Sequence, residues 1–293
     1  YTSTPVQLFI AALICANFFT VAYGSQVQPK DGDPLKDSLE AADKAGRITM
    51  VLSEEAVEAS PDLATETITL PEARQIKSWS QAGANAEKVV GHVAAAETLT
   101  VAWRTNVGKG SDKKAAISAA PVANETTVFT LDAEQQIVAT DLASGRTLWR
   151  TKLKGLSKRD KYSLGGGLAV AGDSLIASGG YGYVTALDAN TGAEKWQKEM
   201  TSPMTGAPTI KDGRIFVESN NNEIYALKLS DGEVEWSDQA ITETARVLGS
   251  PSPAAVEDFV IAPYSSGEVI AYLASNGRRL WTDAISSAGR FTP

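Results

Sequence analysis

Hydrophobic and polar positions along residues 121–281 follow one frame that occurs four times. A glycine marks the origin of each copy, a tryptophan stands four residues after it, and an alanine stands six residues before it. Two adjacent apolar residues lie sixteen and seventeen positions before each glycine. No insertion breaks the frame over 29 consecutive positions, and fixed repeats of roughly 40–50 residues indicate a propeller or a solenoid. The repeated pairs are Gly145 and Trp149, Gly192 and Trp196, Gly232 and Trp236, and Gly277 and Trp281.

Each copy of the frame predicts four short strands. In the third copy the apolar runs fall at residues 207–210, 214–218, 223–228 and 233–236, with Gly, Asn and Asp between them. Regular short strands separated by such turn residues are typical of an all-β protein. Four strands per repeat correspond to one blade of a β-propeller. The sequence therefore predicts an all-β fold with about four complete, four-stranded propeller blades.

The glycine and the tryptophan of the repeat are expected to be architectural. The glycine lies between the third and fourth predicted strands, where a tight hairpin needs a positive φ that glycine adopts without a clash. Asp141 and Asp188, four residues before the glycine, can accept hydrogen bonds from turn N–H groups. The tryptophan can cover the seam between two blades, and the alanine suits a crowded inner strand. Stacking of the tryptophans on a sugar or a quinone is the functional alternative, but a residue present in every repeat favours architecture.

A separate segment, residues 99–107, resembles the end of a repeat without its beginning. We expect it to be a strand, because its Trp103-Arg104 pair parallels the pair at the end of the first repeat. Propeller rings commonly close with an N-terminal strand as the outer strand of the last blade. Since each of the four repeats already has an outer strand, Trp103 predicts a further blade. Residues 291–293 are then expected to begin a fifth repeat of a chain truncated at its C-terminus.

Residues 1–24 are expected to direct export. Residues 6–22 are almost wholly apolar, and this length fits the core of a signal peptide better than a membrane-spanning helix. Two routes of maturation are open. Cleavage after Gly24 would release the chain, whereas lipidation of Cys15 would make it a bacterial lipoprotein, for which Ile14 is a poor preceding residue.

The rest of the chain divides into two parts. Residues 25–98 are predicted to form an acidic extension and linker, with a short helix at residues 35–45 in an otherwise extended tether. Residues 99–293 are predicted to form the partial propeller.

Charge and composition exclude several classes of function. A formal net charge of −8 and a pI of about 4.9 argue against nucleic acid as a partner. With one cysteine and one histidine, the chain forms no intrachain disulfide, no Cys-based zinc site and no cluster of histidine ligands. Two basic clusters, at residues 109–114 and 152–161, are interpreted as solvated loops that balance the acidic extension. No catalytic residue, cofactor site or metal site is expected.

Particular stretches of the chain resemble a known family. The motif in ATDLASGRTLW and ALDANTGAEKW resembles the PQQ-type propeller repeat. The irregular segments WSQAGANAEKVVGH, AWRTNVGKGS and PYSSGEVIAYLASNGRRLWTD are similar to the BamB family in its α-proteobacterial form. The resemblance is collinear over residues 46–293, and it implies an eight-bladed propeller.

The resemblance also implies a role. Members are lipoproteins on the periplasmic face of the outer membrane, held there by a lipid that would here be on Cys15. They are non-enzymatic scaffold subunits of the BAM machinery, with BamA, other barrel-assembly subunits and unfolded outer-membrane proteins as implied partners. The loop that enters the family's fourth blade carries an apolar–Arg–Gly motif that contributes to the BamA contact. The matching residues are Val247, Leu248 and Gly249, with Leu248 in place of the Arg, and an apolar entry into a strand is the alternative interpretation.

Two other functions are compatible with the repeat. A PQQ-dependent quinoprotein dehydrogenase shares the repeat motif, but the resemblance implies PQQ, Ca²⁺ and, in many members, adjacent cysteines, whereas Cys15 stands alone. A generic periplasmic propeller that binds a peptide or a glycan is the second alternative, although no loop shows a convergent polar site.

Overall fold

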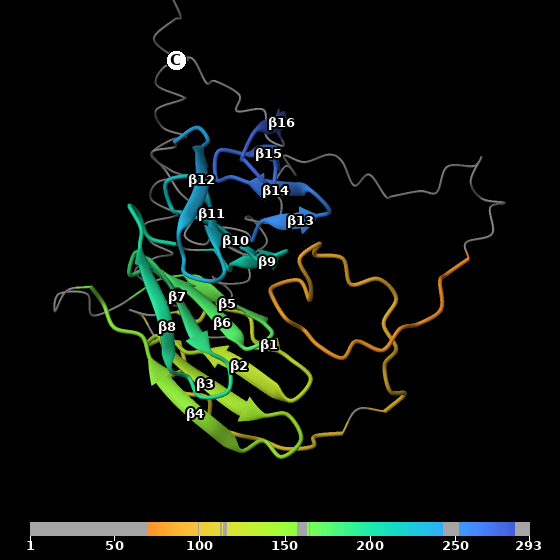
Figure 1. The fold of residues 1–293 in the computed structure, drawn as a ribbon. Coiled ribbons are helices and arrows are strands. Elements are labelled where there is room, and N and C mark those ends of the chain that lie inside the picture. The colour runs from red at the N-terminus through yellow and green to blue at the C-terminus, as the bar shows by residue number, and fades with distance from the viewer. Residues whose placement is uncertain are drawn as a thin grey trace, which may run out of the picture. The chain divides into compact units, whose positions relative to one another are not determined.

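Among the described residues, β-strands are the only regular secondary-structure elements, and loops and turns connect them (Figure 1). The structure, a computed structural model, describes residues 69–98, 100–111, 113, 116–156, 163, 165–204, 206–242 and 252–284. The predicted helix at residues 35–45 and the export segment lie outside these residues. The strands are β1 Val122–Ala123, β2 Thr127–Leu131, β3 Gln136–Asp141, β4 Thr147–Lys152, β5 Gly166–Ala171, β6 Ser174–Gly179, β7 Tyr183–Asp188, β8 Glu194–Glu199, β9 Thr209–Lys211, β10 Arg214–Glu218, β11 Glu223–Lys228, β12 Val234–Gln239, β13 Ala254–Val256, β14 Phe259–Pro263, β15 Glu268–Leu273 and β16 Arg279–Ala284.

The strands form four separate antiparallel sheets, each made of four strands that follow one another in the chain. We call them blade 1 (β1–β4), blade 2 (β5–β8), blade 3 (β9–β12) and blade 4 (β13–β16). One repeat of the sequence corresponds to one blade, so the prediction of an all-β, propeller-like fold with four complete blades is confirmed.

The constant spacing of alanine and tryptophan in the four repeats corresponds to the same cross-strand pair in every blade. The alanine of the third strand lies directly opposite the tryptophan of the fourth strand, as in the Ala186–Trp196 pair, and the register shifts immediately after the alanine. The same pair and shift occur in the other blades, at Ala139–Trp149, Ala226–Trp236 and Ala271–Trp281. The expectation that the alanine lies on an inner strand is wrong. The first strands of neighbouring blades contact each other and are the inner ones, whereas the alanine lies one strand from the outer edge, where its small side chain faces the indole.

Three hydrophobic cores join the four blades in series. The adjacent apolar residues of the second strands make this possible, because successive side chains of a strand point to opposite faces. In blade 2, Leu175 packs toward blade 1 and Ile176 toward blade 3. In blade 3, Ile215 packs toward blade 2 and Phe216 toward blade 4. Side chains that are fully buried in this way contribute about 1.5–3 kcal/mol each.

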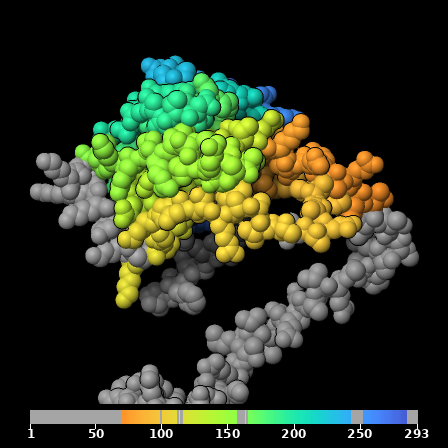
Figure 2. Space-filling view, turned by 90° about the horizontal axis from the view of Figure 1, so that it is seen from below, coloured from red at the N-terminus to blue at the C-terminus, as the bar shows by residue number. Residues whose placement is uncertain are grey.

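Residues 79–86, which we call the inner segment, bond to the first strand of every blade. Trp79 exchanges two backbone hydrogen bonds of 2.8 Å with Ala123 of β1, and the carbonyl of Ser80 accepts a hydrogen bond from the N–H of Val170 on β5. At the other end, the carbonyl of Ala86 accepts one from the N–H of Ala255 on β13. Figure 2 shows the first described part of the chain, in orange, beside the blades.

A side chain makes the remaining contact of the inner segment. The amide of Gln81 donates to the carbonyl of Ile210 at 3.1 Å, and its oxygen accepts from the N–H of Ile210 at 2.8 Å. Gln81 is buried, so this pair of bonds substitutes for a neighbouring strand along β9.

Gln81→Ala is expected to lower the free energy of unfolding by about 1–3 kcal/mol, because it leaves two buried backbone groups of Ile210 without these partners. Urea denaturation of the purified protein measures the change. Gln75→Ala, at an exposed position of the preceding segment, is the control and should leave stability unchanged. An equal, small effect of both substitutions would contradict the structural role of Gln81.

Candidate functional site

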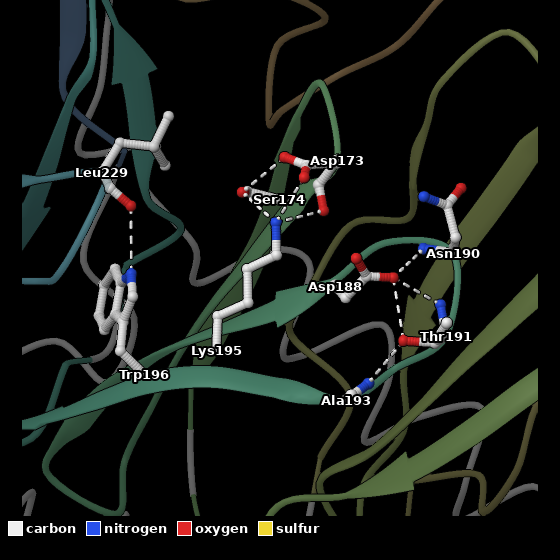
Figure 3. A network of polar contacts seen from close by, with 9 residues as sticks. All are labelled: Asp173, Ser174, Asp188, Asn190, Thr191, Ala193, Lys195, Trp196 and Leu229. Atoms are coloured by element: carbon white, nitrogen blue, oxygen red, sulfur yellow. Dashed lines mark hydrogen bonds and ion pairs between the residues drawn. The ribbon is translucent and has the colours of Figure 1, made fainter.

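The repeated tryptophans lie at the seams between blades. The indole N–H of Trp149 donates to the carbonyl of Ala189 in blade 2 at 3.0 Å, and that of Trp196 donates to Leu229 in blade 3 at 3.1 Å (Figure 3). Trp236 makes the same bond to Ala274 in blade 4, at 2.9 Å. Each tryptophan therefore joins its own outer strand to the third-to-fourth-strand turn of the next blade.

The repeated glycines form the other half of each contact. All four have a positive φ of 71–75°. A Cβ on Gly192 would lie 2.5 Å from the ring of Trp149, and one on Gly232 would lie 2.6 Å from the ring of Trp196. A Cβ on Gly277 would meet Trp236 at 2.5 Å. Glycine is thus required twice at these positions, by the backbone conformation and by the close approach of the indole.

Trp103 makes this same contact without belonging to a blade. Its indole N–H donates to the carbonyl of Leu142 at 2.9 Å, and a Cβ on Gly145 would lie 2.6 Å from its ring. The predicted strand around it is wrong for residues 100–107, none of which lies in a strand. A strand requires a ladder partner, and the described residues provide none for this segment. At the opposite end of the series, Trp281 is 48% exposed, and no described residue accepts a hydrogen bond from its indole N–H.

A carboxylate closes the turn in blades 1 and 2. In blade 2, Asp188 accepts hydrogen bonds from the N–H groups of Asn190 and Thr191 and from the Thr191 hydroxyl (Figure 3). These bonds, first of all the one from the Thr191 side chain, lower the pKa of Asp188. Asp141 makes the equivalent bonds to Ser144, which likewise lower its pKa.

We expect Asp188→Ala to destabilise the protein at neutral pH and to have a progressively smaller effect at acidic pH. Because the folded-state pKa is lowered, the stabilisation is fully present above the unfolded value of about 3.9 and is lost as pH falls through the folded pKa. Denaturant unfolding across the acidic range, with Asn190→Ala as control, measures this. A difference between wild type and variant that stays constant down to the lowest pH would contradict the role of the charge.

Blade 3 contains a buried carboxyl group that the sequence pattern does not predict. Glu218 ends β10, its side chain is buried, and its Oε1 has no hydrogen-bond partner among the described residues. Burial raises the pKa of Glu218 well above its usual value, because enclosure disfavours the charged carboxylate. The corresponding positions of the other blades hold Leu131, Ser178 and Pro263. A carboxylate at this position of the repeat, where the other blades have none, is the only sign of the buried group in the sequence.

Two tyrosines of blade 4, in the core between blades 3 and 4, also have raised pKa values. The hydroxyls of Tyr264 and Tyr272 lie 2.7 Å apart, and burial raises the pKa of both. Neither they nor Glu218 belong to a metal-binding cluster, since the described residues contain no group of three or more His, Cys, Asp or Glu able to hold a metal ion. The described residues also include no helix that is both long and apolar enough to cross a membrane.

The remaining residues singled out by the sequence are not described. Cys15 and the candidate partner-contact residues Val247, Leu248 and Gly249 lie outside the described ranges. The structure therefore brings together the repeated glycines and tryptophans, and it places them at seams between blades.

Comparison with known proteins gives a family. The family model described as outer membrane protein assembly factor BamB matches residues 86–160 and 133–292. The outer membrane protein assembly factor BamB of Yersinia pestis is 28% identical over 192 residues, which cover 64% of this chain and 48% of the relative. The chain spans about half the length of the curated assembly factors that it matches, or less.

The fold is shared with enzymes. The quinohemoprotein alcohol dehydrogenase ADH IIB of Pseudomonas putida is 25% identical over 154 residues, which cover 47% of this chain and 22% of the enzyme. The crystal structure of quinohemoprotein alcohol dehydrogenase from Comamonas testosteroni superposes with a TM-score of 0.59 at 15% identity, covering 72% of this chain and 42% of the enzyme chain. This structural likeness concerns the fold alone.

Proposed function

The chain belongs to the BamB family of outer membrane protein assembly factors, and on that basis we propose that it is a non-enzymatic scaffold subunit of the machinery that assembles outer-membrane β-barrel proteins. It binds the periplasmic part of BamA, and it has unfolded barrel proteins as clients. The observation that carries this proposal is the family match, which runs through all four blades.

The geometry of the repeated residues supports a scaffold. The aromatic side chains that a sugar or quinone site would use are engaged in blade seams at Trp149, Trp196 and Trp236. Binding then falls to loops and outer strands, which is how rigid β scaffolds commonly present recognition surfaces.

Position in the cell forms part of the same proposal. The protein works at the periplasmic face of the outer membrane, and a lipid on Cys15 anchors it there. Val247, Leu248 and Gly249 contribute to the BamA contact. Mass spectrometry of the mature N-terminus tests the anchor, because a diacylated Cys15 and a chain beginning after Gly24 differ in mass.

Co-purification from envelope extract tests the proposed partner. The tagged protein is expected to retain BamA, and Leu248→Glu is expected to reduce the amount retained. Val89→Glu, which places the same charge at an exposed apolar position, is the control and should leave retention unchanged. Consistent failure to retain any barrel-assembly subunit would contradict the proposal.

The enzymatic alternative has one specific observation in its favour, which is the 25% identity to a quinohemoprotein alcohol dehydrogenase. It predicts oxidation of alcohols or sugars after PQQ and Ca²⁺ are added to the folded protein. We expect no such activity. A PQQ-dependent reduction of an artificial electron acceptor would replace the scaffold proposal.

A further inference from the structure

Positive charge is concentrated in the part of the sequence that contains blade 1, in a chain that is acidic overall. Residues 100–161 contain 11 Lys and Arg against 6 Asp and Glu, whereas the whole chain contains 27 against 35. Fields of one sign over part of a surface favour partners of the opposite sign. The arrangement of these cations on the blade decides what kind of partner they suit.

Four exposed cations lie along or beside the outer strand of blade 1, and we call them the basic rim: Lys109, Arg150, Lys152 and Lys154. Lys152 and Lys109 both reach the carboxylate of Glu134, at 2.9 and 3.7 Å. Arg150 donates to the backbone carbonyl of Asn106 at 2.9 Å. Blade 1 and the yellow residues that precede it in the chain appear in Figure 2.

Arg150 and Lys152 project from one face of β4. They lie opposite Val138 and Gln136 of β3, while Trp149 lies opposite Ala139 and points into the seam with blade 2. The two cations therefore stand two residues apart on the face of blade 1 that is turned away from its neighbour.

The outer strands of the other blades differ in their charges. At the two positions equivalent to Arg150 and Lys152 they carry Gln197 and Glu199, Ser237 and Gln239, and Thr282 and Ala284. Two of their cations each meet a single carboxylate. Lys195 pairs with Asp173 at 2.9 Å, and Arg279 pairs with Asp238 at 2.6 Å. Charge of either sign would protect an edge strand from aggregation, so a surplus of positive charge, found among the four outer strands on β4 alone, needs another explanation.

β4 is also a free edge. Among the described residues its only ladder partner is β3, so the backbone N–H and C=O groups of its other side are open to a further strand. We propose that the outer edge of blade 1 binds an extended acidic polypeptide segment as an added strand, whose carboxylates at alternate positions pair with Arg150 and Lys152.

Strand addition explains more of the surface than a membrane does. It uses the open backbone edge for affinity and the side chains at alternate positions for selectivity. An anionic bilayer would use the charges but not the edge. The inference rests on the proposed scaffold function for its biological meaning, since it names the chemistry of one partner segment. Its test uses the purified protein alone, so its failure is distinct from a failure to retain BamA.

Fluorescence anisotropy with the 293-residue chain tests the inference directly. The probe is a short labelled peptide that alternates Glu with Thr and Val. We expect saturable binding that weakens on going to about 0.15 M salt, where the Debye length is about 8 Å. A peptide with Lys in place of Glu, and an acidic peptide N-methylated at alternate residues, should both bind weakly. Equal binding of the N-methylated peptide would overturn strand addition.

The substitutions Arg150→Gln and Lys152→Gln, made together, should weaken binding of the acidic peptide by about twofold to thirtyfold, as expected for two exposed ion pairs. Ser237→Glu and Gln239→Glu, made together, lower the net charge by the same amount at the equivalent positions of β12 and should change binding less than twofold, on the order of experimental error. Equal weakening by both pairs would show that only net charge matters and would overturn the proposal.

Vesicles of phosphatidylethanolamine and phosphatidylglycerol form the last arm of the test. Binding to these vesicles without binding to the acidic peptide would assign the basic rim to an anionic membrane and overturn the proposal. Absence of binding to either probe would overturn it as well. Far-UV circular dichroism of each variant shows whether the blades remain folded.

Discussion

Replacing Gly192 with alanine is expected to lower the free energy of unfolding by several kcal/mol, although only one methyl group is added. The backbone at Gly192 has a φ of 72°, which costs an L-residue about 1–2 kcal/mol. The new Cβ would lie 2.5 Å from the ring of Trp149 and 2.7 Å from the hydroxyl of Thr151. Displacing a packed side chain adds roughly 1–3 kcal/mol.

A second glycine of the same blade separates these two costs. Gly182 has a φ of 86°, but no atom lies within 4 Å of a Cβ built there. Gly182→Ala should therefore show the cost of the backbone alone, and Gly192→Ala should exceed it. Chemical denaturation measures the loss of stability in both variants. If the two variants lose equal stability, the close contact between position 192 and the ring of Trp149 does not add to the cost of the substitution.

Trp236→Ala is expected to have the largest effect of any tryptophan substitution, about 3–5 kcal/mol. Trp236 is only 8% exposed, and its ring packs between Phe216 and Tyr272 at centroid distances of 6.0 and 5.7 Å. The substitution removes these contacts, leaves a cavity in the core between blades 3 and 4, and deprives the Ala274 carbonyl of its donor.

Trp281→Ala is the matched control, because the residue occupies the same position of the frame. It lies opposite Ala271 just as Trp236 lies opposite Ala226, but it is 48% exposed. We expect a loss of about 1 kcal/mol or less, in the range of surface substitutions. Thermal or urea unfolding of the two variants gives the comparison. Losses of equal size would mean that burial in the seam is not what stabilises the tryptophan.

The architecture of the blades could be predicted from the sequence because its signals are local. The glycine of each turn and the tryptophan four residues later report a backbone conformation and an outer strand within a few residues of each other. Repetition then multiplies a weak signal by four. The same locality explains the error over the alanines, since spacing along the chain shows which residues pair but not which strand of a blade lies innermost.

Contacts between distant residues escaped prediction. Gln81 is separated by 129 residues from its partner Ile210, and nothing in the stretch around it distinguishes a buried structural amide from an exposed one. Trp103 was linked to the repeat by its neighbours in sequence, yet whether its segment forms a strand depends on a partner that local sequence does not specify. Glu218 stands at the end of an apolar run, and only the structure shows that it is enclosed.

The inner segment has a consequence for the order in which this protein folds. Neighbouring blades follow one another in the chain and can form in turn, as in other repeat proteins. Residues 79–86 come before all of them but bond to Ala123, Val170, Ile210 and Ala255. Ala255, the last of these partners, is synthesised only after the residues of three blades. Each contact closes a loop between residues 79–86 and its partner, and closing a long loop is entropically costly and slow. Folding therefore begins among the blades and ends at the inner strands, with a segment that was synthesised before any of its partners.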